Sequence, residues 1–341
     1  MKKYNVVIVG AGPGGLECAY NLGGSELNVL LIEKNKIIGP KVCAGGLTPK
    51  NLNWIPKELL DSSFKQAYIH YQKQSFKISQ SDDLIATVNR QKLGHYQLNK
   101  LKKFSNIEIL TGIYVKQIFS NGSLILSNDK LIYFDFLVGA DGAFSEVRKH
   151  LKLPTKKLSI AIQYIIPKQF DKLEIFFDNK LWGTGYSWIF PHKDYDSIGC
   201  GTDINFLNIK KLKSNFDYWL EKQRIDLKNA KFEAAPINCD YRGYQFDNIF
   251  LAGDAAGLTS GVTREGIYPA VISGRQIAWD ILGINKKDNL IKKWLIQKRK
   301  QEKYLFVLKS PAFVKFLIFS TLFLLTKSQR VQSKLKNIFL S

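Results

Sequence analysis

Apolar residues near the start of the chain form two continuous runs, at 6–9 and 29–32, and the segment between them has helical spacing. Runs of this kind are typical of strands that are buried on both faces, as in a parallel sheet covered by helices. The pattern therefore predicts a strand–helix–strand unit of the α/β class at this end of the chain.

The spacing changes to a period of two after residue 106, where short apolar runs alternate with polar positions. Asn121-Gly122 separates two of these runs, and Asn-Gly in that position is a strong signal for a tight hairpin. We expect a β-meander over 107–134 and then a buried strand at 136–139. A second stretch, 158–202, is rich in aromatic residues and predicts an antiparallel sheet with one face on a core or cavity. Further elements are expected as helices at 90–101, 209–223 and 265–282, and as a strand at 248–253.

The first strand leads directly into a glycine-rich turn, Gly10-Ala11-Gly12-Pro13-Gly14-Gly15, and the second strand ends in Glu33. Strand, GxGxxG turn, helix, strand and acid together form the complete fingerprint of a dinucleotide-binding unit. Gly10 permits the turn, Gly12 lets the backbone approach a pyrophosphate, and Gly15 lets the helix pack on the strand. The helix N-terminus would offer free N–H groups to the phosphates, and Glu33 would accept hydrogen bonds from a ribose. We predict an FAD or NAD site here.

Three further motifs follow in order. They are Val138-Gly139-Ala140-Asp141-Gly142-Ala143-Phe144-Ser145, then Gly185-Tyr186-Ser187-Trp188-Ile189-Phe190-Pro191, then Leu251-Ala252-Gly253-Asp254-Ala255-Ala256-Gly257. Each of them, taken alone, could be a turn or a core strand. Together with the fingerprint they resemble the FAD-dependent oxidoreductases related to p-hydroxybenzoate hydroxylase. Within that superfamily the chain is similar to the geranylgeranyl reductase family, over roughly residues 4–285.

The resemblance implies a fold and a division of the chain. We expect an α/β protein in which a Rossmann-type FAD-binding domain, glutathione-reductase-like in its meander, is interleaved with an antiparallel β-sheet substrate domain. The expected parts are an FAD-binding domain at 1–70, 85–155 and 245–285, a substrate domain at 70–85 and 156–244, and a basic, partly apolar helical tail at 286–341.

The resemblance also assigns roles to cofactor-binding residues. Glu33 would hold the adenosine ribose, Arg90 would reach the FAD, and Asp141 would lie beside the pyrophosphate. Asp254 would hold the ribityl chain, and the backbone at Gly266 would face the flavin. The full set of expected cofactor residues is Gly10, Ala11, Gly12, Pro13, Gly14, Gly15, Glu33, Lys34, Ala44, Gly45, Arg90, Val115, Asp141, Gly142, Asp254, Gly266 and Ile267.

Two features resemble the reductase subfamily in particular. The loop Cys43-Ala44-Gly45-Gly46 matches a Cys-Gly-Gly-type segment that crosses the flavin. The YxWxFP strand would form an aromatic wall, which suits a long apolar substrate because it offers area without directional partners. The expected substrate residues are Cys43, Tyr186, Trp188, Phe190 and Arg264, and Cys43 is also the candidate catalytic residue.

The chain departs from the family pattern at three positions. His192 stands where the family usually has lysine, Gly261 where it has proline, and Arg264 where it has glycine. A cation at 264 could favour an anionic reduced flavin, bind a phosphate head group or point to solvent.

The expected activity is FAD-dependent reduction of carbon–carbon double bonds in a prenyl, geranylgeranyl-type lipid or isoprenoid. The alternatives are an FAD-dependent monooxygenase or halogenase on an apolar substrate, and a non-catalytic, membrane-associated flavin-binding protein. The sequence has no second GxGxxG turn, so NADPH or a reduced ferredoxin would act as a transient electron donor.

Charge and composition limit the partners. The chain has 341 residues and a formal net charge of +21, of which +11 falls in residues 291–341. Such a tail suits an anionic membrane surface, and no usual nucleic-acid-binding motif is present. The apolar stretch 316–325 would span about 15 Å as a helix, half of a ~30 Å hydrocarbon core, so it could lie in the membrane interface or be buried in the protein.

The cysteines and histidines lack metal-ligand spacing, and no signal peptide precedes the first strand. These residues are Cys18, Cys43, Cys200, Cys239, His70, His95, His150 and His192. Cysteines that are scattered along the chain without CxxC pairs indicate a reducing compartment. We therefore expect a cytoplasmic, peripherally membrane-associated protein without a metal site.

Overall fold

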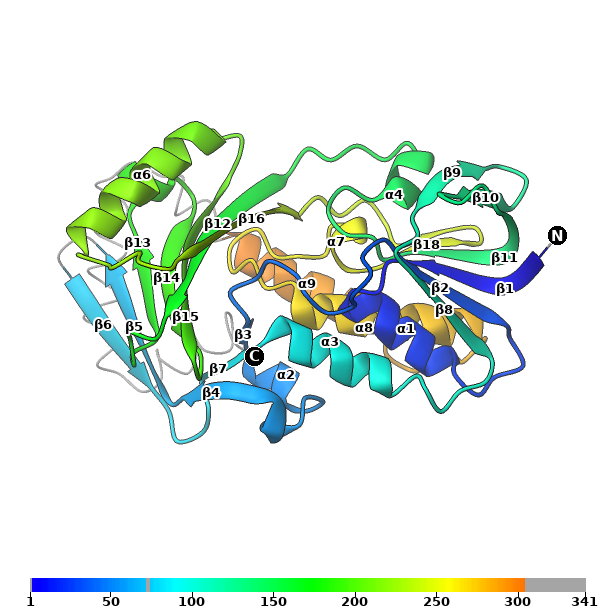
Figure 1. The fold of residues 1–341 in the computed structure, drawn as a ribbon, viewed down its shortest axis with the longest axis horizontal. Coiled ribbons are helices and arrows are strands. Elements are labelled where there is room, and N and C mark those ends of the chain that lie inside the picture. Colours follow the sequence, from blue (N-terminus) through cyan, green and yellow to red (C-terminus); the bar gives the residue numbers. More distant parts are fainter. Residues whose placement is uncertain (1, 72–73, 304–341) are drawn as a thin grey trace.

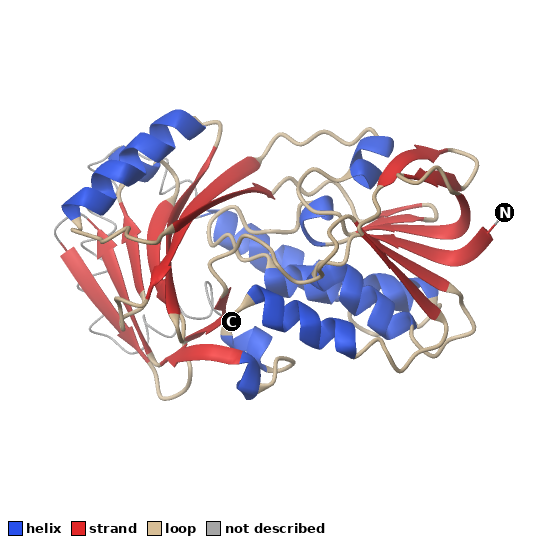
Figure 2. Ribbon diagram, in the orientation of Figure 1, coloured by secondary structure: helices blue, strands red, loops and turns tan. Residues whose placement is uncertain are grey.

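Two large sheets lie toward opposite ends of the molecule in the computed structural model, which describes residues 2–71 and 74–303 (Figure 1). Most of the longer helices are gathered along one side of the first sheet (Figure 2). The chain passes between the two halves more than once, because strands of the second sheet come from both sides of helix α3 (Arg90–Asn99) in the sequence.

The first sheet confirms the predicted α/β unit. Its strands follow the order β17 (Gln245–Phe246), β18 (Ile249–Leu251), β11 (Leu131–Gly139), β1 (Lys2–Val9), β2 (Val29–Glu33) and β8 (Ile107–Thr111). From β18 to β8 all neighbours are parallel. The hairpin of β9 (Val115–Phe119) and β10 (Ser123–Leu126) extends β11 in antiparallel fashion, with the predicted Asn-Gly turn between its strands.

Successive residues of the central strands enter different hydrophobic cores, which explains why their sequences are apolar without interruption. Val7 and Leu30 face a core shared with the meander and helix α9, whereas Val6 and Leu31 face a core shared with helices α1 and α8. Both faces of the sheet are therefore covered, as parallel sheets require.

The strand limits differ from the sequence expectation at two points. The end of the expected meander and the strand expected at 136–139 form one strand, β11, because the Asp135 carboxylate between them is satisfied by the Asn5 side-chain amide at 2.9 Å. Within the expected meander, strand β9 begins only at Val115, because Gly112 and Ile113 donate their N–H groups to the carbonyls of Asn35 and Glu33 instead.

The second sheet confirms the predicted strand-rich stretch. Its order is β16 (Lys231–Asn238), β12 (Leu158–Pro167), β15 (Tyr195–Asp203), β14 (Tyr186–Pro191), β13 (Glu174–Phe177), β5 (Gln66–Tyr71) and β6 (Gln74–Ser79). All pairs are antiparallel except β13 with β5. Helix α6 (Ile209–Lys222) covers one face through Leu212, Phe216, Trp219 and Leu220.

A small third sheet and several helices complete the described chain. The sheet joins β3 (Gly46–Leu47), β7 (Ile85–Val88) and β4 (Leu60–Phe64). The remaining helical segments are α1 (Pro13–Leu22), α2 (Pro49–Leu52), a 3-10 turn (Lys57–Leu59), α4 (Glu146–His150), α5 (Asn179–Trp182), α7 (Gly253–Ala256), α8 (Ile267–Ile281) and α9 (Leu290–Lys303).

Helix α9 packs into the core of the first domain, the part of the molecule built on the first sheet, since Ile291 and Trp294 are buried there. The Trp294 indole N–H donates to the Leu258 carbonyl at 2.8 Å. The predicted apolar stretch 316–325 lies outside the described residues. Among the helices within 2–71 and 74–303, none is long and apolar enough to cross a membrane.

Candidate functional site

A cavity of about 530 Å³ with a mainly apolar lining lies between the two large sheets. Many of the predicted site residues line it, although they come from distant parts of the sequence. They are Gly12, Pro13, Gly14, Cys43, Ala44, Arg90, Gly142, Tyr186, Trp188, Phe190, Asp254, Arg264, Gly266 and Ile267. The predicted residues outside the lining are Gly10, Ala11, Gly15, Glu33, Lys34, Gly45, Val115 and Asp141.

The glycines of the first turn are needed for different physical reasons. A Cβ on Gly10 would lie 2.4 Å from the Ala140 carbonyl oxygen, and one on Gly15 would lie 1.9 Å from the Gly10 carbonyl oxygen. The fold itself therefore requires these two glycines. A Cβ on Gly12 would meet only the Ala140 oxygen, at 3.9 Å, so a bulkier residue there would extend into the cavity.

The start of α1 is open toward that cavity. Gly12 is the N-cap and Pro13 is the first helical residue, and no side chain caps the free N–H groups. Uncapped N–H groups at a helix N-terminus are suited to phosphate binding. The site thus fits the diphosphate of a dinucleotide.

Glu33 supports this turn from the end of β2. Its carboxylate accepts hydrogen bonds from the Ala11 N–H at 2.8 Å and from the backbone and side chain of Asn35 at 2.9 and 2.8 Å. Lys34 beside it is exposed, and Val115 is buried in the core behind the first sheet. Neither of these two residues is brought to the cavity.

The Asp141-Gly142 turn lies on the other side of Gly10. One oxygen of Asp141 accepts the N–H groups of Glu146 and Val147, at 2.7 and 3.4 Å, and so caps α4. The other oxygen is buried and has no hydrogen-bond partner within residues 2–71 and 74–303. Burial raises the pKa of this carboxyl. Gly142 has a positive φ of 86°, and a Cβ there would meet no atom within 4 Å.

Arg148 connects this turn to the Asp254 motif, which explains why both motifs occur together. Its guanidinium donates to the carbonyls of Ala255 at 3.1 Å and Asp240 at 2.8 Å. Asp254 then faces the cavity, where its carboxylate accepts from the Thr259 hydroxyl at 2.6 Å and lies 3.4 Å from the Lys41 ammonium. No sequence motif indicates this role for Lys41.

Arg90 begins helix α3, whose N-cap Asn89 accepts from the N–H groups of Gln91 and Lys92 at 3.0 and 3.1 Å. The Arg90 Nε atom is buried and makes no hydrogen bond to the described part of the chain. An unpartnered guanidinium nitrogen at a cavity wall is suited to an acceptor on a bound ligand.

The loop before α8 carries a second unusual cation. Arg264 has a positive φ of 54°, a left-handed conformation that favours glycine. Its guanidinium packs on the Tyr186 ring at 5.2 Å, and one nitrogen donates to the Val262 carbonyl at 3.3 Å. Nε and Nη2 are buried and make no hydrogen bond of normal geometry within the residues described. The side chain therefore does not point to solvent.

Glu265, next in this loop, is tied to helix α2. Its carboxylate lies 3.0 Å from the Lys50 ammonium and accepts from the Thr48 hydroxyl at 2.7 Å. Burial lowers the pKa of Lys50, although the Glu265 charge opposes this. The pair fixes the segment that leads to Gly266 and Ile267.

The aromatic strand β14 forms one wall of the cavity. Tyr186, Trp188 and Phe190 alternate along it, so they share one face of the sheet. The Trp188 indole N–H donates to the Ser197 hydroxyl at 3.1 Å, and this hydroxyl donates to the Gln163 side chain at 3.1 Å. Sequence reasoning missed the apolar residues that β5 and β6 add to the wall, which include Ile69, Phe76 and Ile78. Their signal in the sequence is a short alternation of apolar and polar residues at 66–71 and again at 74–79.

The loop that contains Cys43 lies between this wall and the first domain. Gln163 donates to the Cys43 carbonyl at 3.4 Å, and a ring nitrogen of His192 lies 3.0 Å from the Ala44 carbonyl oxygen. Gly45 has a φ of 74°, and a Cβ there would lie 2.5 Å from the Val88 oxygen. No cluster of three or more metal-ligating side chains occurs in the described part of the chain.

Known proteins resemble this chain in sequence. Residues 4–148 match the family described as pyridine nucleotide-disulphide oxidoreductase. An uncharacterised protein of Methanosarcina barkeri is 32% identical, over 92% of this chain and 83% of that protein. The geranylgeranyl diphosphate reductase of Rhodobacter capsulatus is 26% identical, over 81% of this chain and 74% of that enzyme.

Solved structures share the fold. A geranylgeranyl bacteriochlorophyll reductase-like protein from Thermoplasma acidophilum superposes with a TM-score of 0.76 at 23% identity, over 91% of this chain and 87% of that one. A p-nitrophenol 4-monooxygenase from Pseudomonas putida has a TM-score of 0.77 at 14% identity, over 98% and 97% of the two chains. At these identities the structures support the fold alone.

Proposed function

Because this chain belongs to the geranylgeranyl reductase family of FAD-dependent oxidoreductases, we propose that it saturates carbon–carbon double bonds of a prenyl, geranylgeranyl-type lipid or isoprenoid. One observation carries the proposal. A single cavity has an open, glycine-lined phosphate site at one side and an aromatic and aliphatic wall at the other. A dinucleotide and a long apolar chain would meet there.

The first domain would hold the FAD. The N–H groups at the start of α1 suit the pyrophosphate, Arg90 suits an acceptor on the cofactor, and Asp254 suits the ribityl hydroxyls. Asp141 would lie beside the pyrophosphate and shape the Gly142 turn that lines the cavity. Reduced FAD, when bound, supplies the hydride for such a reaction.

The second sheet would orient the apolar chain. Tyr186, Trp188 and Phe190 provide contact area, and their wall excludes water from the reacting double bond. Cys43 is the thiol that lines the cavity, whereas Cys18, Cys200 and Cys239 are buried elsewhere. We assign Cys43 as the candidate to deliver a proton to the second alkene carbon.

Arg264 suits an acidic head group on the isoprenoid. Arg264 lines the cavity next to the aromatic wall, and two of its guanidinium nitrogens have no hydrogen-bond partner in the described part of the chain, so a phosphate that reached them would find free donors. A comparison of prenyl phosphate with the corresponding prenyl alcohol tests this role. We expect Arg264→Gln to weaken use of the phosphate and to leave use of the alcohol unchanged, whereas an equal effect on both substrates would contradict it.

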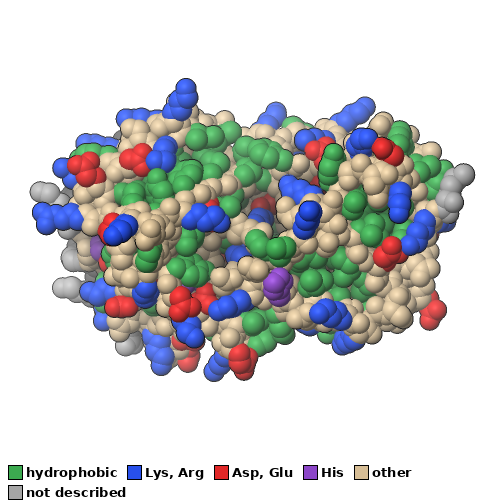
Figure 3. Space-filling view, viewed as in Figure 1, with side chains coloured by type: hydrophobic (Ala, Val, Ile, Leu, Met, Phe, Trp, Pro, Cys, Tyr) green, Lys and Arg blue, Asp and Glu red, His purple; other side chains and the backbone are tan. Residues whose placement is uncertain are grey.

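We also place the enzyme at an anionic membrane surface, in the cytoplasm. The net charge of +21 supports the anionic surface, and Figure 3 shows lysine and arginine side chains scattered over the face in view. The cysteines without paired spacing support the cytoplasm. NADPH or a reduced ferredoxin would deliver electrons, and anaerobic titration of the oxidised protein with each donor would distinguish them.

Anaerobic turnover tests the proposed activity. The purified protein would be reduced without oxygen, mixed with geranylgeranyl lipids, and its products would be analysed by mass spectrometry. Saturated prenyl chains are the expected result. Strict dependence on oxygen would instead support the monooxygenase or halogenase, whose fold this chain shares. Absence of any substrate-linked reoxidation would support a non-catalytic flavin-binding protein.

A further inference from the structure

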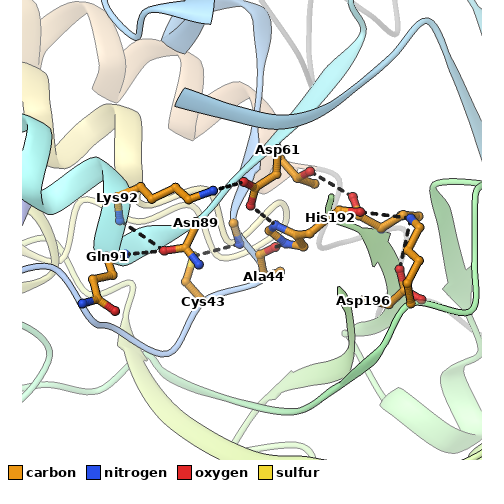
Figure 4. A network of polar contacts seen from close by, with 12 residues as sticks. Cys43, Ala44, Asp61, Asn89, Gln91, Lys92, His192 and Asp196 are labelled. Atoms are coloured by element: carbon orange, nitrogen blue, oxygen red, sulfur yellow. Dashed lines mark hydrogen bonds and ion pairs between the residues drawn. The ribbon is translucent and has the colours of Figure 1, made fainter. Parts of the chain in front are cut away.

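His192 lies directly after the aromatic strand and is almost completely buried, with 2% of its surface exposed. Its Nδ1 atom lies 2.9 Å from a carboxylate oxygen of Asp61 on β4, and its Nε2 atom lies 3.0 Å from the carbonyl oxygen of Ala44. Figure 4 shows the ring between these two partners, which come from different elements. The ring of Tyr195 stacks on it at 4.2 Å.

Both partners are hydrogen-bond acceptors. A backbone carbonyl never donates, and an ionised carboxylate accepts only. A neutral imidazole has one N–H group and would leave one ring nitrogen facing an acceptor lone pair. Both contacts are therefore hydrogen bonds at the same time only when His192 carries two N–H protons and a positive charge.

The surroundings keep the Asp61 partner ionised. Burial opposes its charge, but the hydrogen bonds and charges of His192 and of Lys92, whose ammonium lies 3.3 Å away, hold the pKa of Asp61 below its usual range. The other titratable groups around the ring are Tyr195, Cys43, Lys168, which donates to the His192 carbonyl at 3.0 Å, and Asp196, which lies 3.4 Å from Lys168.

The contact to Ala44 reaches the cavity. Ala44 and Cys43 line it, and the adjacent Gly45 lies so close under the imidazole that a Cβ there would be 2.7 Å from His192 Cε1. Within residues 2–71 and 74–303, Gln163 of the second sheet makes a weaker contact of 3.4 Å to the Cys43 carbonyl, and the adjacent Gly45 carbonyl accepts the Val88 N–H of the third sheet at 3.0 Å. The His192–Asp61 pair is thus the main polar attachment of the loop to the second sheet.

We propose that the charged His192, bridging Asp61 and the Ala44 carbonyl, positions the Cys43–Ala44 loop at the cavity, and that loss of its proton releases the loop. His192 is a positioning residue in this proposal, since its ring does not line the cavity. The effect on turnover rests on the proposed function, because it assumes that the cavity is the active site. The effect on the loop does not.

The first measurement follows the loop without any substrate. The rate at which a maleimide labels Cys43 in the FAD-bound protein would be compared between wild type and His192→Gln at the same pH. We expect the variant to react roughly tenfold faster, because one hydrogen bond from a charged donor is lost. The control is His70→Gln. His70 on β5 lies 3.2 Å from Glu174 on β13, so its removal leaves the contacts of the Cys43–Ala44 loop intact.

The second measurement uses Asp61→Asn. The asparagine amide can donate to Nδ1 of a neutral His192, whose Nε2–H still donates to Ala44, so both contacts survive deprotonation. Wild-type turnover is expected to fall once the pH is high enough to remove the second ring proton of His192, because the contact to Ala44 or to Asp61 is then lost. In Asp61→Asn this fall should disappear while turnover persists at alkaline pH.

Equal labelling of Cys43 in wild type and His192→Gln, or an unchanged alkaline fall in Asp61→Asn, would overturn the proposal. Should His192→Gln fail to fold, the Asp61→Asn profile and its labelling rates across pH still decide it. Failure of the proposed function has a different signature. Prenyl lipids would then remain unreduced while the labelling difference between His192→Gln and His70→Gln persisted.

Discussion

Some glycines and carboxylates around the phosphate loop are required by the fold, whereas others are open to a ligand. Gly10 and Gly15 are in contact with neighbouring backbone, whereas Gly12 borders open space in the cavity. Asp141 caps α4 with one oxygen and holds the other buried without a partner in the described residues. A residue that the fold does not require, at the mouth of a site, is a candidate for contact with a ligand.

Gly12→Val should abolish FAD binding and leave the apoprotein folded, because the added side chain enters only the space that the pyrophosphate would occupy. Flavin absorbance per protein and the thermal unfolding midpoint of the apoprotein measure the two effects. Gly15→Val is the matched control, and it should prevent folding because its Cβ would overlap the Gly10 carbonyl. Full FAD content in Gly12→Val would refute the site.

The raised pKa of Asp141 predicts how the stability of the fold depends on pH. Burial raises its pKa in the folded state, so the folded protein binds this proton more readily than the unfolded chain does. Its contribution to stability is therefore present at low pH and is lost as pH rises through the folded-state pKa.

Asp141→Asn should remove that loss. The unfolding free energy of the apoprotein variant, relative to wild type, is expected to increase from about pH 4 to pH 7, the range above an ordinary aspartate pKa. Urea unfolding at several pH values measures it. A constant difference between the two proteins would show that Asp141 does not titrate in this range.

At the scale of elements, strand β14 both lines the cavity and packs against its neighbouring strand. Trp188 faces the cavity, while its ring also lies against Gly199 of β15, where a Cβ would come within 2.3 Å of it. Trp182, in the short helix just before the strand, is fully buried against α6 and does not line the cavity. The two tryptophans therefore allow packing to be tested separately from the proposed substrate contact.

Trp188→Ala and Trp182→Ala should each destabilise the protein by about 3–5 kcal/mol, the usual cost of truncating a large core aromatic. Only Trp188→Ala should raise KM for long prenyl substrates, with FAD content unchanged. Thermal unfolding, flavin content and steady-state kinetics at a temperature where both variants are folded measure these effects. A similar rise in KM for both variants would mean that Trp188 is solely a packing residue.

At the scale of the whole molecule, the cavity exists because two sheets are joined by several chain crossings. Strands β5 and β6 leave the first domain to complete the second sheet, and β16 returns the chain to β18. Helix α9 then closes the first domain through Trp294, and Lys298 donates to the Cys239 carbonyl at 2.9 Å. The C-terminal region is therefore part of the fold as far as Lys303.

Two C-terminal truncations test the packing of helix α9 separately from membrane binding. A chain ending at Lys303 should keep its thermal stability and FAD but lose binding to vesicles that contain phosphatidylserine, because residues 304–341 carry six lysines and arginines, no acid and the apolar stretch 316–325. A chain ending at Asp288 should also lose stability, because Ile291 and Trp294 leave the core.

Sedimentation with vesicles at low and high salt measures the binding, and phosphatidylcholine vesicles are the control. Binding of the full chain should weaken with salt, since exposed charges are screened over about 8–10 Å at physiological ionic strength. Full binding by the chain that ends at Lys303 would place the membrane contact elsewhere.

Local sequence determined the first domain. Two uninterrupted apolar runs, the glycine turn between them and Asn121-Gly122 specify parallel strands, a phosphate loop and a hairpin, because each depends on backbone geometry within a few residues. The same motifs indicated the FAD family and an apolar substrate wall. Strand limits were less certain where a polar residue such as Asp135 found its partner across the sheet.

Tertiary structure alone decided the contacts that depend on distant parts of the chain. The parallel pairing of β13 with β5, the burial of Arg264 against Tyr186 and the position of His192 between Asp61 and Ala44 join residues separated by about 80 to 150 positions. No local pattern encodes such pairs, because a polar side chain has the same sequence signal whether its partner is water or a buried acceptor. Only the folded chain fixes which of these groups lose water and what they bind instead.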